Sequence, residues 1–162
     1  MIALAVLAGC STPGKPQPGP SPSAAAPQPS FADVSRGDTD SVVRLRAYDP
    51  AARSAVVEPT VFMQGPDFCT AFRLPEDDPR CDQEWTTEDS HTKVTLPVEE
   101  DVRLLSHGAG DPACIGQGTG AGTCPVTPET FGMMLRRDGG DLLVKLRTED
   151  GRVVEMAELY TP

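Results

Sequence analysis

The sequence lacks an apolar run that can cross a bilayer, because its N-terminal run ends at Cys10 and a spanning helix needs about 20 apolar residues. Aromatic residues make up only 5% of the 162 residues, with a single tryptophan. Basic residues are also few: 14 Lys and Arg stand against 24 Asp and Glu, for a formal net charge of −10. Since phosphate groups are repelled by such a surface, the composition argues against a nucleic-acid partner.

The motifs of common catalytic and metal sites are missing as well. No serine lies in a GxSxG motif, no two cysteines form a CxxC, and His91 and His107 are not at ligand spacing from any cysteine. The glycines of residues 116–120 are spaced as in some phosphate-binding loops, but no lysine lies near them. We therefore predict no catalytic residue, no metal ligand and no cofactor. One alternative stays open, in which the five carboxylates of residues 76–84 hold calcium.

Five cysteines are present, and four of them fall within residues 69–124. An even set of cysteines in an exported domain is typical of disulfides. Three pairings are possible, and we favour Cys69–Cys81 and Cys114–Cys124, because each pair brackets a short segment rich in Pro, Gly or Asp. By chain entropy alone, a closed loop of this size adds about 3 kcal/mol to stability.

The fifth cysteine follows the N-terminal apolar run, in the sequence Leu7-Ala8-Gly9-Cys10-Ser11. An apolar run that ends in small residues is typical of a secretory signal. This stretch resembles the lipobox of bacterial lipoprotein signal peptides. The resemblance implies that the thiol of Cys10 receives a diacylglyceryl group and that residues 1–9 are removed. Two acyl chains make a stable anchor, so we expect the protein at the extracytoplasmic face of the cell membrane.

One feature departs from the lipoprotein pattern, since no basic residue precedes Cys10. We therefore expect the complete signal to begin upstream of Met1, with residues 1–9 as its remnant. The alternative is an ordinary buried N-terminal segment with a free thiol at Cys10.

A linker follows the lipobox, over residues 11 to about 38. It holds seven of the 17 prolines, which are Pro13, Pro16, Pro18, Pro20, Pro22, Pro27 and Pro29. Its Pro/Ser/Ala-rich composition predicts a flexible tether that extends to about 85 Å, at roughly 3.1 Å per residue. The chain therefore divides into a signal remnant (1–9), a lipidated cysteine with its linker (10–40) and a globular domain (41–162).

The globular part opens with a predicted β-hairpin. Apolar and polar residues alternate over 43–48, Asp49-Pro50 forms a turn, and residues 56–63 return. Pro59 implies that the return strand lies at an edge or contains a bulge. Three further short strands are predicted, over residues 84–87, 93–97 and 102–106. The segment 67–85 is expected to be irregular or a single helical turn.

A helix and a second hairpin complete the domain. Thr127-Pro128-Glu129 predicts a helix start, because Thr is a good N-cap, Pro suits the first turn and Glu favours the positive end of the helix dipole. Gly139-Gly140 predicts its end. Residues 141–162 predict a hairpin, in which a strand from 143 or 144 to 146 leads to a turn at 149–151 and residues 153–160 return. The sum is a strand-rich α+β domain, with a small antiparallel sheet of hairpins, one short helix, two disulfides and a flexible N-terminal tether.

The domain also resembles small secreted proteins of high-GC Gram-positive bacteria whose function is uncharacterised. The shared features are an early Tyr48-Asp49-Pro50 hairpin, a TLPV-like segment over 95–98 and a closing strand like DGRVVEMAELYTP. We expect no enzymatic activity, and interpret the protein as a lipid-anchored binding module of the cell envelope with an envelope protein as partner. Two alternatives are a carboxylate-dependent hydrolase, which would use the acids of 76–84 or 99–101, and an accessory factor of an envelope or transport complex.

Overall fold

The computed structural model describes residues 29–161, so the predicted lipidation site Cys10 and most of the linker lie outside the described residues. Within this range the strands are β1 (Thr39–Asp49), β2 (Ser54–Met63), β3 (Thr86–Asp89), β4 (Val94–Ser106), β5 (Cys124–Pro125), β6 (Leu142–Glu149) and β7 (Arg152–Glu158). The helices are α1 (Gly65–Phe72), α2 (Pro128–Arg137) and a short 3₁₀ turn, Pro112–Cys114. The strand-rich α+β fold and both predicted disulfides, Cys69–Cys81 and Cys114–Cys124, are confirmed. A second α-helix, α1, stands where the sequence suggests at most one turn.

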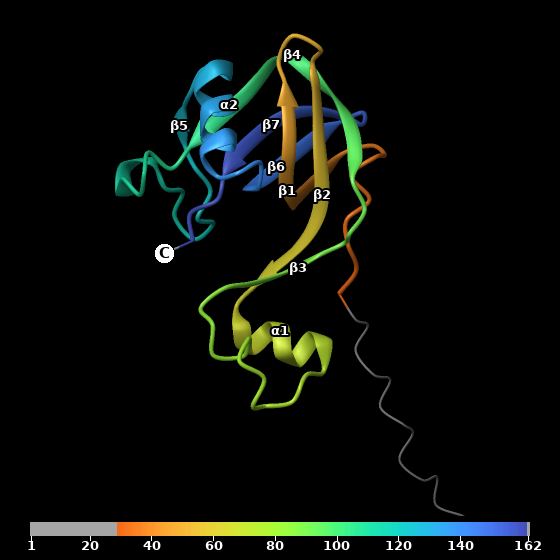
Figure 1. Cartoon of the computed structure of the whole chain (residues 1–162), viewed down its shortest axis with the longest axis vertical. Coiled ribbons are helices and arrows are strands. Elements are labelled where there is room, and N and C mark those ends of the chain that lie inside the picture. Colours follow the sequence, from red (N-terminus) through yellow and green to blue (C-terminus); the bar gives the residue numbers. More distant parts are fainter. Residues whose placement is uncertain (1–28, 162) are drawn as a thin grey trace, which may run out of the picture.

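Five of the strands close into a barrel (Figure 1). β1 pairs with β2 and β6, β2 also pairs with β4, and β7 pairs with both β4 and β6. The β4–β7 pair is parallel, so the sheet is mixed where the sequence predicts antiparallel hairpins alone. Turn residues reveal only strands that are neighbours in the chain, which is why this pairing escapes sequence reasoning.

The connectivity of the barrel is that of the OB-fold, a five-stranded Greek-key barrel. The strands run in the order β1-β2-β4-β7-β6, and α2 connects the third barrel strand, β4, to the fourth, β6. This likeness describes the architecture and assigns no function by itself.

Strand β4 is continuous, which corrects the prediction of two separate strands over residues 93–97 and 102–106. Its register against β7 shifts between Val98 and Arg103, and residues 99–101 lie in this irregular stretch. A bulge bends a strand and increases its twist. β4 can therefore pair with β2 at one end and with β7 and β5 at the other.

The barrel is filled by inward-facing aliphatic residues, and α2 packs across β1 and β4. The helix begins as predicted, because the Thr127 hydroxyl accepts a hydrogen bond from the N–H of Thr130. Its Phe131 is fully buried and meets Tyr48 edge-on, with 6.0 Å between the ring centroids.

The residues just before β1 also belong to the packed domain. Val34 is buried, at 1% exposed, and Thr148 Oγ1 donates to the carbonyl of Gly37. Packed structure thus begins inside the stretch that the sequence assigns to the linker.

β2 runs beyond the barrel and forms a two-stranded arm with β3. Residues 54–57 of β2 pair with β4, whereas residues 60–63 pair with β3. Between them the carbonyl of Pro59 accepts from the N–H of Ser90. The nitrogen of Pro59, which has no hydrogen, falls where β2 changes partner, so the proline breaks no ladder bond there.

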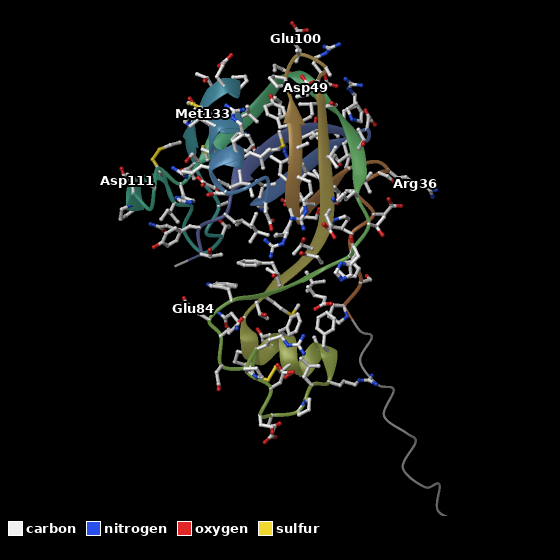
Figure 2. The ribbon with its side chains drawn as sticks, viewed as in Figure 1. Arg36, Asp49, Glu84, Glu100, Asp111 and Met133 are labelled. Atoms are coloured by element: carbon white, nitrogen blue, oxygen red, sulfur yellow. A yellow bond between two sulfur atoms is a disulfide. The ribbon has the colours of Figure 1, made fainter. Side chains whose placement is uncertain are left out.

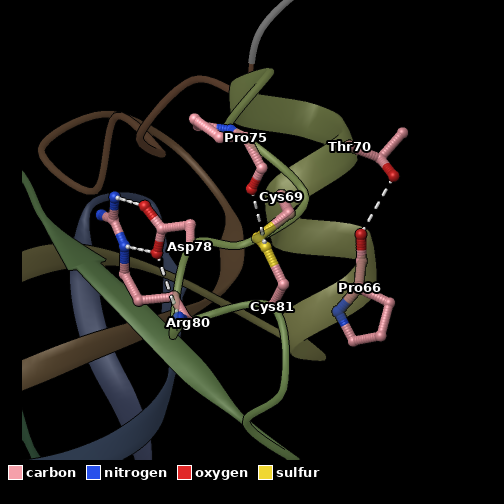
Figure 3. The surroundings of a disulfide bond; sticks show 7 residues. All are labelled: Pro66, Cys69, Thr70, Pro75, Asp78, Arg80 and Cys81. Atoms are coloured by element: carbon pink, nitrogen blue, oxygen red, sulfur yellow. Dashed lines mark hydrogen bonds and ion pairs between the residues drawn. A yellow bond between two sulfur atoms is a disulfide. The ribbon is translucent and has the colours of Figure 1, made fainter.

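The arm carries a small separate unit, the disulfide lobe (residues 64–85), which holds α1 and the Cys69–Cys81 bond (Figures 1 and 3). Its small core centres on Phe68, which is fully buried, stacks on Phe72 at 4.3 Å and lies under the Arg80 guanidinium. Gly65 fits tightly against the returning chain, because a Cβ there would lie 2.4 Å from the carbonyl oxygen of Gln83. The glycine therefore sets the path of the segment that leads into β3.

Candidate functional site

A hollow of about 750 Å³ lies between the barrel and the disulfide lobe. We call it the groove, and its lining includes Arg44, Phe62, residues 83–87, His107, Asp138, residues 141–143 and residues 158–161. One wall is the outer face of β1 and β6 with the end of β7, and the other is the chain that leaves the lobe and enters β3. Figure 2 shows Glu84 on the chain that leads from the lobe to β3.

Two stacked aromatic rings line the groove. The ring of Phe62 on β2 and that of Trp85, just before β3, are 4.8 Å apart and nearly parallel at 8°. Both residues are half-buried, and Phe62 also packs against a small apolar cluster that includes Leu159 and half-buried Leu143. Trp85 borders a second hollow of about 530 Å³, whose other side is the glycine loop of residues 116–120. The tryptophan therefore stands between two neighbouring hollows.

An ionic cluster ties the arm to the barrel on the same face. Arg44 on β1 donates from Nε to both carboxylate oxygens of Asp89 at 2.9 Å, and from Nη1 to Asp141 at 3.1 Å. Arg46 contacts Glu58 at 2.8 Å and Asp141 at 3.0 Å. The sequence places both arginines on a solvated strand face, whereas their side chains are only 21% and 22% exposed. The cause is that carboxylates from three segments meet over them: Asp89 on β3, Glu58 on β2 and Asp141 just before β6.

The electrostatics of this cluster favour charged side chains. Burial acts to lower the pKa of the Arg46 guanidinium, but the hydrogen bond to Glu58 and the charge of Asp141 outweigh it and raise that pKa. With two guanidinium groups against three carboxylates, the cluster is held by its own ion pairs. It positions β3 at the groove rather than offering an anion site.

His107, which directly follows β4, also lines the groove and is largely buried. Its side chain is 16% exposed, its Nδ1 accepts from the N–H of Gly110 at 3.0 Å, and its Nε2 lies 3.1 Å from Glu158. The second oxygen of Glu158 accepts from the Ser106 hydroxyl at 2.8 Å. These partners assign the ring hydrogen to Nε2. Because both ring nitrogens are engaged, His107 has no free nitrogen to act as a base, whereas His91 is 86% exposed.

The acidic segment 76–84 does not converge on one point. Asp78 forms a two-pronged ion pair with Arg80 (Figure 3), and these hydrogen bonds lower the pKa of the Asp78 carboxyl to about 2. Of the five carboxylates in this segment, only that of Glu84 lines the groove. Within residues 29–161, no set of three or more His, Cys, Asp or Glu side chains is arranged to hold a metal ion. Glu99 and Glu100, on β4, pair with arginines, and Glu100 lies at the end of the barrel far from the lobe (Figure 2).

Sequence reasoning misses the residues that make the groove, above all Phe62, Trp85, Arg44 and Glu158. The signal that was available is the single tryptophan, which follows the Cys69–Cys81 segment and is large enough to form a binding surface on its own. The glycines of 116–120 lie inside the Cys114–Cys124 loop as expected, and they form the second hollow.

Neither helix of the described residues is long and apolar enough to cross a membrane. Comparison with protein-family models, with curated proteins and with solved structures finds no significant match to this chain.

Proposed function

We propose that this protein is a lipid-anchored binding module of the cell envelope and that the groove is its ligand site. The observation that carries the proposal is the stacked Trp85–Phe62 pair, half-buried beside convergent polar groups in a hollow of about 750 Å³. Ligand sites combine apolar and aromatic walls with a few placed polar groups in this way. Tryptophan is also among the residues that contribute most to binding energy at interfaces.

The polar side chains of the groove support binding rather than hydrolysis. A carboxylate hydrolase needs one acid that keeps its proton and a second that is ionised. Arg44 is bonded to Asp141, and Glu158 accepts bonds from Ser106 and His107, so these carboxylates already serve the fold. The acids of 76–84 and 99–101 lie on different parts of the molecule. An accessory role in an envelope complex is the same binding activity with a protein as ligand.

The proposed anchor explains how the groove would be presented. A lipidated Cys10 and a linker of about 85 Å when extended would hold the domain near the bilayer without fixing its orientation. The acidic surface, which is repelled by anionic headgroups, would keep the domain off the membrane and its groove open to envelope components.

The anchor is tested with Cys10→Ser in a chain that carries a complete signal, expressed in a high-GC Gram-positive host. Lipidation predicts that the variant moves from the membrane fraction to the medium, while the parent stays membrane-bound. Equal membrane retention of both proteins would contradict the anchor.

The groove is tested with a photo-crosslinking amino acid placed in intact cells at position 84, which lines the groove. The matched control is position 76, an exposed Glu on the same lobe. The proposal predicts a defined adduct from position 84 and none from position 76. The same adducts from both positions, or none from either, would remove the groove as the ligand site.

A further inference from the structure

Strand β3 leaves one of its edges open. In the described part of the chain β3 is the terminal strand of the sheet and pairs with β2 alone. The bond from Ser90 N–H to the Pro59 carbonyl fixes the alternation, so Thr86 and Glu88 turn their backbone groups to β2. Thr87 and Asp89 therefore turn theirs outward. An open edge of this kind can take a further strand.

The groove reaches this part of the chain. Residues 83–87 line it, and two of them, Thr86 and Thr87, belong to β3, where successive side chains point to opposite faces. Lining by both of these strand residues indicates that the groove meets the backbone at the start of β3 as well as one face. The same segment brings Trp85, whose stacked ring marks the start of β3.

The charge of the groove selects among extended ligands. Its lining exposes the carboxylates of Glu84, Asp138 and Asp141 against the single guanidinium of Arg44. The fourth carboxylate, Glu158, is buried and bonded to Ser106 and His107. The whole chain has a formal charge of −10, so its long-range electrostatic potential is negative, like that of the groove lining. Cationic side chains are also attracted to the face of an indole ring. Both features favour a basic partner and disfavour an acidic one.

We propose that the groove binds an extended basic peptide segment, which adds to the open edge of β3 and directs its Lys or Arg side chains past Trp85 to the acidic lining. This inference rests on the proposed binding function and names the chemistry of its ligand. Main-chain hydrogen bonds to Thr87 and Asp89 supply affinity, and the carboxylates supply selectivity for positive charge.

The test uses the full chain with Cys10→Ser and follows the emission of Trp85, the chain's single tryptophan. The probes are three eleven-residue peptides in which Thr alternates with Lys, with Gln or with Glu. We expect the Lys peptide to bind at least about tenfold more tightly than the Gln peptide, and the Glu peptide not to bind. Equal affinity for the Lys and Gln peptides would overturn the charge selection.

Strand addition is tested on the ligand, which leaves the protein fold untouched. One Lys peptide is N-methylated at every Lys and another at every Thr. In an extended peptide the N–H groups of the Lys residues point to one edge and those of the Thr residues to the other. With the Lys side chains facing the groove, only one of these two sets can bond to β3. Methylation of that set should weaken binding, so the affinities of the two peptides should differ by about tenfold or more. Affinities equal to each other would refute addition to the edge.

The matched variants are Glu84→Lys in the groove and Glu76→Lys outside it, which change the net charge equally. Glu84→Lys should weaken binding of the Lys peptide about tenfold and Glu76→Lys by less than about threefold. An equal effect of both would mean that only the overall charge attracts the peptide, which would overturn the site. If no peptide binds while position 84 still crosslinks a partner in cells, this inference fails and the binding function stands.

Discussion

The buried ion pair between Arg46 and Glu58 should contribute far more to stability than an exposed pair of the same two residue types. The Glu58 side chain is 5% exposed, and Arg46 donates to one of its oxygens from Nε at 2.9 Å and from Nη2 at 2.8 Å. The comparison is Glu100, 88% exposed and 3.5 Å from Arg53. Both glutamates lie on strands, and Glu→Ala removes the same atoms from each.

The expected magnitude follows from burial and from what remains after the change. Removing one partner of a fully buried pair costs about 3–5 kcal/mol. Arg46 is 22% exposed and keeps Asp141 at 3.0 Å, so Glu58→Ala should lower the free energy of unfolding by about 2–3 kcal/mol. Glu100→Ala should lower it by less than about 0.5 kcal/mol, since exposed pairs are screened by water and salt.

The assay is urea unfolding at pH 7 with both disulfides intact, followed by Trp85 emission and by circular dichroism. At about 4 °C per kcal/mol, Glu58→Ala should also lower Tm by roughly 8–12 °C. Added salt should reduce what little effect Glu100→Ala has and leave the Glu58→Ala effect largely unchanged. Values for the two variants within 0.5 kcal/mol of each other would refute the assignment of the Arg46–Glu58 pair as structural.

Two further predictions concern the disulfide lobe and α2. The pKa of the Asp78 carboxyl is about 2 because Arg80 bonds to it, so its stabilising effect is present above about pH 4 and is lost as the pH falls towards 2. Asp78→Asn should make stability depend less on pH in that window. An unchanged pH dependence of acid unfolding, measured by circular dichroism, would contradict this. Gly65→Ala should loosen the lobe, because its Cβ would lie 2.4 Å from two backbone carbonyl oxygens. Gly132→Ala in α2, with only a side-chain atom at 3.4 Å, should instead stabilise by about 0.5–1 kcal/mol; equal thermal shifts would refute the distinction.

The features predicted correctly from the sequence are those encoded locally. The two hairpins follow from alternation and turn residues, the start of α2 follows from Thr127, and the two disulfides follow from loop length and composition. The parallel β4–β7 pair was not predicted, because its partners, such as Val98 and Val153, are far apart in the chain. The helix α1 was not predicted either, since the acidic, disulfide-bracketed stretch that follows it favours an irregular interpretation of the whole segment 67–85.

The groove could not be predicted because it lies between parts that the sequence does not place together. Alternation shows that Arg44 and Arg46 face away from the barrel core, and it says nothing of an arm that covers them. The same holds for Glu158, which reads as an ordinary strand residue yet is 3% exposed and bonded to Ser106. Burial of a polar strand residue depends on what packs over it, which is tertiary information.

The β3 wall is held to the barrel by polar contacts of its side chains. The ladder to residues 60–63 of β2 builds the arm, whereas Asp89, paired with Arg44 and Arg46, and Thr87, bonded to Arg44, join β3 to the barrel. These ion pairs are about one-fifth exposed, so water and salt weaken them more than the apolar packing inside the barrel. A basic ligand that approached Asp141 would compete with Arg44 for the same carboxylate. Ligand binding and the position of the arm would therefore be coupled. An acidic ligand would not compete in this way, because the Asp141 carboxylate repels it.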